Sequence, residues 1–217
     1  MKTAIKPQGI EINSVLRNTY MLLSMTMVLS AITAYFGMHV AFSAPLFIGV
    51  IVGAFVLLFA TFAFRNSPVG ILMVFAFTGL MGFATGPTLT HYLKMPGGST
   101  IVASAAGMTA VIFVGLSLYV LVTRKDFSML GGMLFVGLLA LVVAGFVSLF
   151  FHAPIVNLAL AVIGVLIFSG YVLYDTSRIV HGGETNYVLA TISLYLDILN
   201  LFTDLLQIFG FFGGDDD

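Results

Sequence analysis

The chain has 217 residues, of which 60% are hydrophobic and only 8% charged, and its mean hydropathy is +1.13. Soluble globular domains carry about 25% charged residues, so this composition excludes a soluble protein with a large core. The net charge of −1 argues against a nucleic-acid partner, and the absence of cysteine excludes disulfides and thiolate metal sites.

Apolar runs of about 20 residues, each long enough to cross the hydrocarbon layer, follow one another along the chain. The first run is longer than the apolar core of a signal peptide, about 7–15 residues, so we expect a retained span. Short breaks with turn-forming residues separate the runs: "SAP", "RNSP", "KMPGGS", "TRKD", "HAP" and "HGGETN". The predicted spans are residues 20–40, 46–64, 69–89, 101–122, 130–151, 155–174 and 187–211.

This pattern predicts an all-α membrane protein with seven transmembrane helices. A segment of residues 1–19 precedes the transmembrane domain of residues 20–212, and an acidic tail of residues 213–217 follows it. Basic residues predict the orientation, because they gather on the cytoplasmic side of a membrane protein. Of the eight basic residues, Lys94 alone is predicted on the side of the membrane opposite the N-terminus. The other seven lie on the N-terminal side: Lys2, Lys6, Arg17, Arg65, Arg124, Lys125 and Arg178. We therefore expect a cytoplasmic N-terminus and a periplasmic C-terminus.

Five polar side chains interrupt the last span and share an arc of roughly 80° on a helical wheel. This polar stripe consists of Ser193, Asp197, Asn200, Asp204 and Gln207. A charged group at the bilayer centre costs about 2.5–3.5 kcal/mol even on a lenient insertion scale, so the stripe should face other helices or a wet cavity. The last helix is therefore expected inside the bundle. The stripe serves either as hydrogen-bonded packing or as part of an ion or proton pathway.

A second acid lies upstream, in "SGYVLYDTSRIVHGG", where Asp175 precedes Arg178 by about one helical turn. The last two spans form a hairpin through "HGGETN", which places Asp175 level with Ser193 and about one turn from Asp197. Two carboxylates about 4 Å apart repel by roughly 4 kcal/mol at an effective dielectric constant of 20. Such a pair would share one proton and titrate as a unit, which makes it a candidate pH switch.

Several segments resemble the Bax inhibitor-1 (TMBIM) family: "YVLYD", "HGGETNY" and "SLYLDILNLF" near the C-terminus. "LRNTYMLLS", "FAFTGLMG", "TRKDFSMLGGML" and "IVHGGETNYVLATISLY" are similar to its bacterial branch. The resemblance implies a seven-helix bundle around a central last helix. It also implies that Asp175 and Asp197 correspond to the two-aspartate pH sensor of the family and that Arg65 lies near its basic gate partner.

The resemblance implies two alternative functions. As a member of the bacterial branch, the chain would be a multi-pass inner-membrane protein that binds and modulates the FtsH membrane protease. As a leak-type member, it would be a pH-sensitive calcium or cation channel gated by the carboxyl pair. An acid found in the second span of leak-type members is missing from "IGVIVGAFVLL", which weakens the calcium interpretation.

Other sites have less support in the sequence. His39, His91 and His152 fall at the outer ends of three spans and suggest a metal or proton site, but no spacing motif links them. The two intramembrane aspartates suggest an aspartyl protease, but the accompanying "GxGD" and "PAL" segments are absent. No metalloprotease, serine-hydrolase or phosphate-loop motif occurs either. We expect neither an enzyme nor a bound cofactor.

Overall fold

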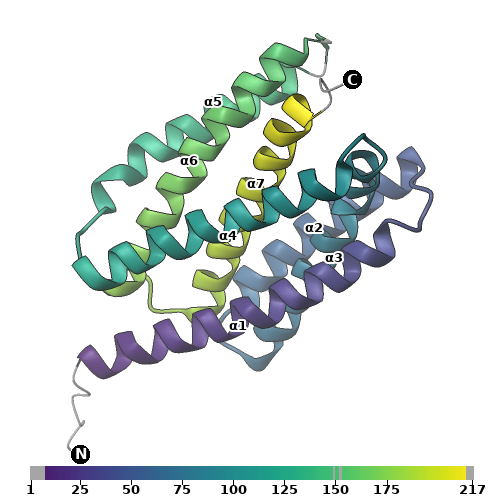
Figure 1. The fold of residues 1–217 in the computed structure, drawn as a ribbon. Helices are drawn as coiled ribbons and strands as arrows, with labels where there is room; N and C mark the ends of the chain where they lie inside the picture. Colours follow the sequence, from purple (N-terminus) through teal and green to yellow (C-terminus); the bar gives the residue numbers. More distant parts are fainter. Residues whose placement is uncertain (1–7, 149, 152, 214–217) are drawn as a thin grey trace, which may run out of the picture. The chain divides into compact units, whose positions relative to one another are not determined.

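A computed structural model describes residues 8–148, 150–151 and 153–213, and this part of the chain forms α-helices without strands (Figure 1). The seven helices are α1 (Gln8–Gly37), α2 (Ala44–Phe64), α3 (Pro68–Leu93), α4 (Gly98–Thr123), α5 (Gly131–Ser148), α6 (Pro154–Val180) and α7 (Tyr187–Gly213). A short 3-10 turn, Ser128–Leu130, leads into α5. All seven are long and apolar enough to cross a membrane, which confirms the predicted class.

The first helix begins at Gln8 rather than at residue 20. Val15 and Leu16 are half-buried and Thr19 is buried, so the added turns bury one face of an amphipathic helix. The predicted span of residues 20–40 followed the length of the uninterrupted apolar run and therefore does not include these turns.

The helices divide between two compact units. Unit 1 comprises the chain up to Pro87 together with Arg178–Tyr195, and unit 2 comprises Thr88–Ser177 and the chain from Leu196 onward. The boundary within α3 falls at Pro87, which lacks the N–H needed for the regular helical hydrogen bond to the carbonyl four residues earlier. Helix α7 contributes its first part to unit 1 and the remainder to unit 2.

In unit 1, glycines bring α1 and α3 close together. A Cβ on Gly82 would collide with the Ser30 carbonyl oxygen, and one on Gly86 would collide with the backbone of Gly37. In unit 2, α4, α5 and α6 pack with the second part of α7. Phe168, Val172 and Leu201 form one apolar cluster there. The glycines at the contacts between α1 and α3 are the small residues that permit close helix packing in lipid.

The last helix is the most buried of the seven. In its most apolar stretch 56% of the residues are buried, compared with 6% to 33% in the other six candidate spans. This burial agrees with the expectation that a helix carrying a polar stripe avoids lipid.

Candidate functional site

The carboxyl groups of Asp175 on α6 and Asp197 on α7 meet inside unit 2, where they are joined by a hydrogen bond. Both residues are buried, with 9% and 5% of their surface exposed. A carboxylate can only accept hydrogen bonds, so a bond between two carboxyl groups requires a proton on one of them. The Oδ2 atom of Asp197 is buried and has no hydrogen-bond partner in the described part of the chain.

One tyrosine interacts with this carboxyl pair, and two hydroxyl side chains follow Asp175 directly along α6. Tyr171, about one turn before Asp175 on α6, interacts electrostatically with both carboxyl groups and with Tyr174. Thr176 and Ser177, which follow Asp175, attach the end of α6 to neighbouring segments. The Thr176 hydroxyl lies 3.4 Å from that of Ser117 on α4, and Ser177 accepts a hydrogen bond of 2.9 Å from the Phe127 N–H.

The rest of the stripe is also withdrawn from the surface. Ser193, Asn200, Asp204 and Gln207 are half-buried. Asn200 donates to the Leu196 carbonyl at 2.7 Å, within α7. The Asp204 carboxyl packs against Gly164 of α6, in a space that a Cβ at this glycine would fill. Its Oδ2 atom is buried and has no hydrogen-bond partner among the described residues.

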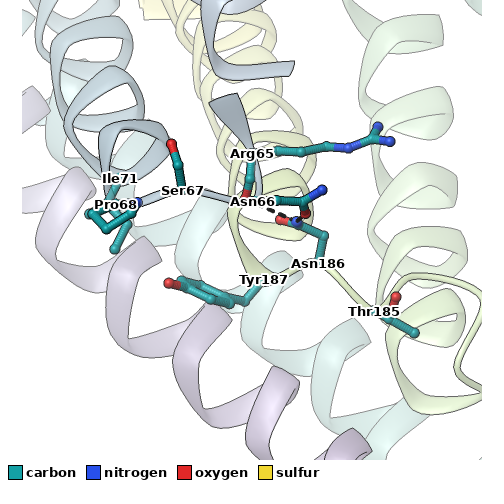
Figure 2. A pocket seen from close by; sticks show the side chains of 8 residues that line it. All are labelled: Arg65, Asn66, Ser67, Pro68, Ile71, Thr185, Asn186 and Tyr187. Carbon is teal, nitrogen blue, oxygen red and sulfur yellow. Dashed lines mark hydrogen bonds between the residues drawn. The ribbon is translucent and has the colours of Figure 1, made fainter. Parts of the chain in front are cut away.

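Arg65, the predicted gate partner, belongs to unit 1, whereas the carboxyl pair belongs to unit 2. Its gating role stays a prediction. Arg65 is exposed and lines a pocket of about 360 Å³ (Figure 2). The other lining residues are Asn66, Ser67, Pro68, Ile71, Thr185, Asn186 and Tyr187. The pocket is therefore lined by the α2–α3 turn and by the segment that leads into α7.

Asn186 holds the wall of this pocket together. Its Nδ2 donates to the Arg65 carbonyl at 3.0 Å and to Asn66 Oδ1 at 2.9 Å (Figure 2). Its Oδ1 accepts the Val188 and Leu189 N–H groups at 3.0 and 3.2 Å, so Asn186 also caps the start of α7. In the sequence, "HGGETN" indicated only a turn. The signal for the cap is an asparagine directly before an apolar helical run.

A second group that sequence reasoning missed is centred on Tyr195, which is fully buried in unit 1. Its hydroxyl lies 2.7 Å from Ser30 Oγ on α1 and donates to the Thr78 carbonyl on α3 at 3.0 Å. On the helical wheel Tyr195 lies nearly opposite Asp197, about 160° away, so the stripe gave no indication of it. Three helices of unit 1 thus share one buried phenol.

The histidine hypothesis stays a prediction. The His39 ring pairs through Nδ1 with the Tyr35 carbonyl at 2.8 Å, in unit 1. His91 belongs to unit 2, and His152 lies outside the described residues. Over the described ranges, no group of three or more histidine and acidic side chains could hold a metal ion.

The family assignment rests on a match over nearly the whole chain. A family profile described as "Inhibitor of apoptosis-promoting Bax1" matches residues 12–214, from α1 to the end of α7. The chain belongs to the Bax inhibitor-1 family. The predicted resemblance is therefore confirmed.

Relatives within the Bax inhibitor-1 family match the chain nearly from end to end. The "Modulator of FtsH protease YccA" of Escherichia coli is 45% identical over 94% of this chain and 92% of its own length. An uncharacterized protein of Pseudomonas aeruginosa is 48% identical over 95% of this chain and 93% of its own. The "Protein lifeguard 4" of mouse is 36% identical, over 88% and 82%.

Proposed function

We propose that this chain is a multi-pass protein of the bacterial inner membrane that binds and modulates a protease of the FtsH kind. The observation that carries the proposal is its 45% identity to the modulator YccA over 94% of the chain. Since the match extends over 94% of this chain and 92% of the relative, it covers nearly all of both chains rather than one shared segment. A modulator needs a binding surface and no catalytic constellation, in keeping with the absence of enzyme motifs from the sequence.

The interaction is open to a direct test. Tagged protein is expected to co-purify with the FtsH protease from solubilised inner membranes, and its overexpression should lengthen the half-life of membrane substrates of the protease. Turnover is measured by pulse–chase labelling. A matched seven-helix membrane protein from another family, expressed at the same level, controls for crowding of the membrane. Unchanged substrate half-lives together with no co-purification would overturn the proposal.

In this proposal the N-terminal segment is the element offered to the protease. Deleting residues 1–11 is expected to abolish inhibition while the remaining bundle stays folded. A shorter deletion of residues 1–7, which lie outside the described residues, leaves α1 intact from Gln8 onward. Comparing the two deletions separates the tail from the first turn of α1. Full inhibition by both variants would remove the segment from the mechanism.

The orientation follows from the uneven distribution of basic residues, seven of eight on one side. We expect the N-terminus in the cytoplasm and the C-terminus in the periplasm. Alkaline phosphatase fused at the C-terminus should be active, and a fluorescent protein that fails to fold in the periplasm should be bright only at the N-terminus. Both ends on the same side would contradict seven complete crossings.

We also propose a second function, a proton-regulated cation leak. The observation that favours it is the buried, hydrogen-bonded pair Asp175 and Asp197. Intramembrane acids that pair with each other commonly mark ion or proton pathways. The two proposals are compatible, because a protein that binds a protease can also conduct.

A further inference from the structure

The side chains that line the unit 1 pocket form an environment suited to an anion. None of its eight lining residues is acidic, whereas Arg65, Asn66, Thr185 and Tyr187 can all donate hydrogen bonds. In Figure 2 the Arg65 side chain extends to one side of the two asparagines, and the Asn66 amide nitrogen lies on that side. Asn66 Oδ1 already accepts from Asn186, which leaves the Asn66 amide N–H groups without a partner in the described structure.

The acid closest in sequence to the pocket is neutralised by its own contacts. Glu184 Oε1 accepts the Asn186 N–H at 2.8 Å, and Oε2 pairs with Arg178 at 3.6 Å. Arg65 forms no ion pair among the residues described, so its charge is available to a ligand. A guanidinium always carries a positive charge, and its planar fork matches the oxygen atoms of phosphate.

The pocket also lies where a lipid headgroup would be found. Helix α2 ends at Phe64 and α3 begins at Pro68, so the lining turn joins the ends of two candidate spans. Beside it Phe64, Val69 and Leu72 are exposed by 49%, 43% and 63%. A volume of about 360 Å³ is near the lower end of the roughly 300–1,000 Å³ typical of ligand pockets, which suits a headgroup.

We propose that this pocket binds the phosphate group of an anionic phospholipid. Arg65 and the Asn66 amide donate to the phosphate oxygens, Thr185 contributes its hydroxyl, and the acyl chains run over the neighbouring apolar side chains. The site differs from the carboxyl pair and does not depend on the protease interaction. It gives the α2–α3 turn and the start of α7 a common ligand.

Lipid binding is tested with the purified full-length protein by native mass spectrometry, using phosphatidylglycerol and phosphatidylcholine as probes. The wild-type protein should retain phosphatidylglycerol preferentially. Arg65→Gln should weaken that binding by about tenfold, the expected effect of removing a hydrogen bond from a charged donor. Asn66→Asp should weaken it at least as much, because it keeps an acceptor for Asn186 but places a carboxylate oxygen beside the phosphate.

Arg17→Gln is the matched control, because Arg17 is an exposed basic residue of unit 1 that does not line the pocket. It should change phosphatidylglycerol binding by less than twofold, and all three variants should unfold at the wild-type temperature without added lipid. If inorganic phosphate competes with phosphatidylglycerol, the site is supported and also binds the free ion. If added phosphate leaves lipid binding undiminished, the site is specific for the lipid headgroup. Equal loss in Arg65→Gln and Arg17→Gln, or equal retention of the two lipids, would overturn the proposal.

Discussion

Replacing Gly86 by alanine should lower the free energy of unfolding by about 2–3 kcal/mol, near the upper end of the usual cost of overpacking. A Cβ at this position would lie 2.6 Å from the Gly37 Cα and 2.6 Å from the Met38 nitrogen, and would collide with the Gly37 carbonyl carbon. All three atoms belong to the backbone at the end of α1, so no side chain can rotate to make room. Helices α1 and α3 must separate, which loosens unit 1.

Gly107→Ala on α4 is the control for this substitution, because a Cβ there would meet nothing within 4 Å. Alanine has a higher helix propensity than glycine, by about 1 kcal/mol in water, so this change should be neutral or slightly stabilising. Reversible unfolding of both variants in mixed micelles, followed by circular dichroism, provides the comparison. If the two variants unfold at the same denaturant concentration, the close approach of α1 and α3 does not limit stability.

Features that depend on hydropathy and length could be predicted from the sequence. Each of the seven predicted spans corresponds to one helix. Helix α2 ends at Phe64 and α7 begins at Tyr187, as predicted. Helix α1 begins before the predicted span of residues 20–40, because its first turns are amphipathic rather than uniformly apolar. Asp175 and Asp197 could be placed at a similar depth, because a hairpin of known length links their helices.

Contacts between segments remote in sequence could not be predicted in this way. Gly37 meets Gly86 because of how α1 and α3 cross, and periodicity within a single helix does not determine that crossing. Tyr195, Ser30 and Thr78 come together from three helices for the same reason. The pocket could not be predicted, because its walls come from two turns that Asn186 joins. Each turn alone resembles an ordinary break between spans.

The carboxyl pair leads to the prediction with the largest effect on function. At low pH the hydrogen bond between Asp175 and Asp197 holds α6 and α7 together through a shared proton. As the pH rises and that proton leaves, two buried carboxylates about 4 Å apart would repel by roughly 4 kcal/mol at an effective dielectric constant of 20. Any cation leak should therefore increase with pH. Tyr171 interacts with both carboxyl groups and with Tyr174, and phenols ordinarily ionise only at about pH 10, so they do not account for a step near neutrality.

Asp197→Asn keeps the shape of the side chain and gives Asp175 an amide donor whose hydrogen bond needs no shared proton. The pH-dependent step in cation flux into liposomes should disappear, together with an infrared band of the protonated carboxyl. Asp204→Asn is the matched control, because Asp204 lies on the same stripe about 10 Å further along α7 and packs against Gly164 instead. It should leave the step in place. If the carboxyl groups serve only as packing, both variants would change stability modestly and neither would alter the response to pH. Superimposable curves of flux against pH for the wild type and Asp197→Asn would therefore rule out the switch and leave the protease interaction as the remaining function.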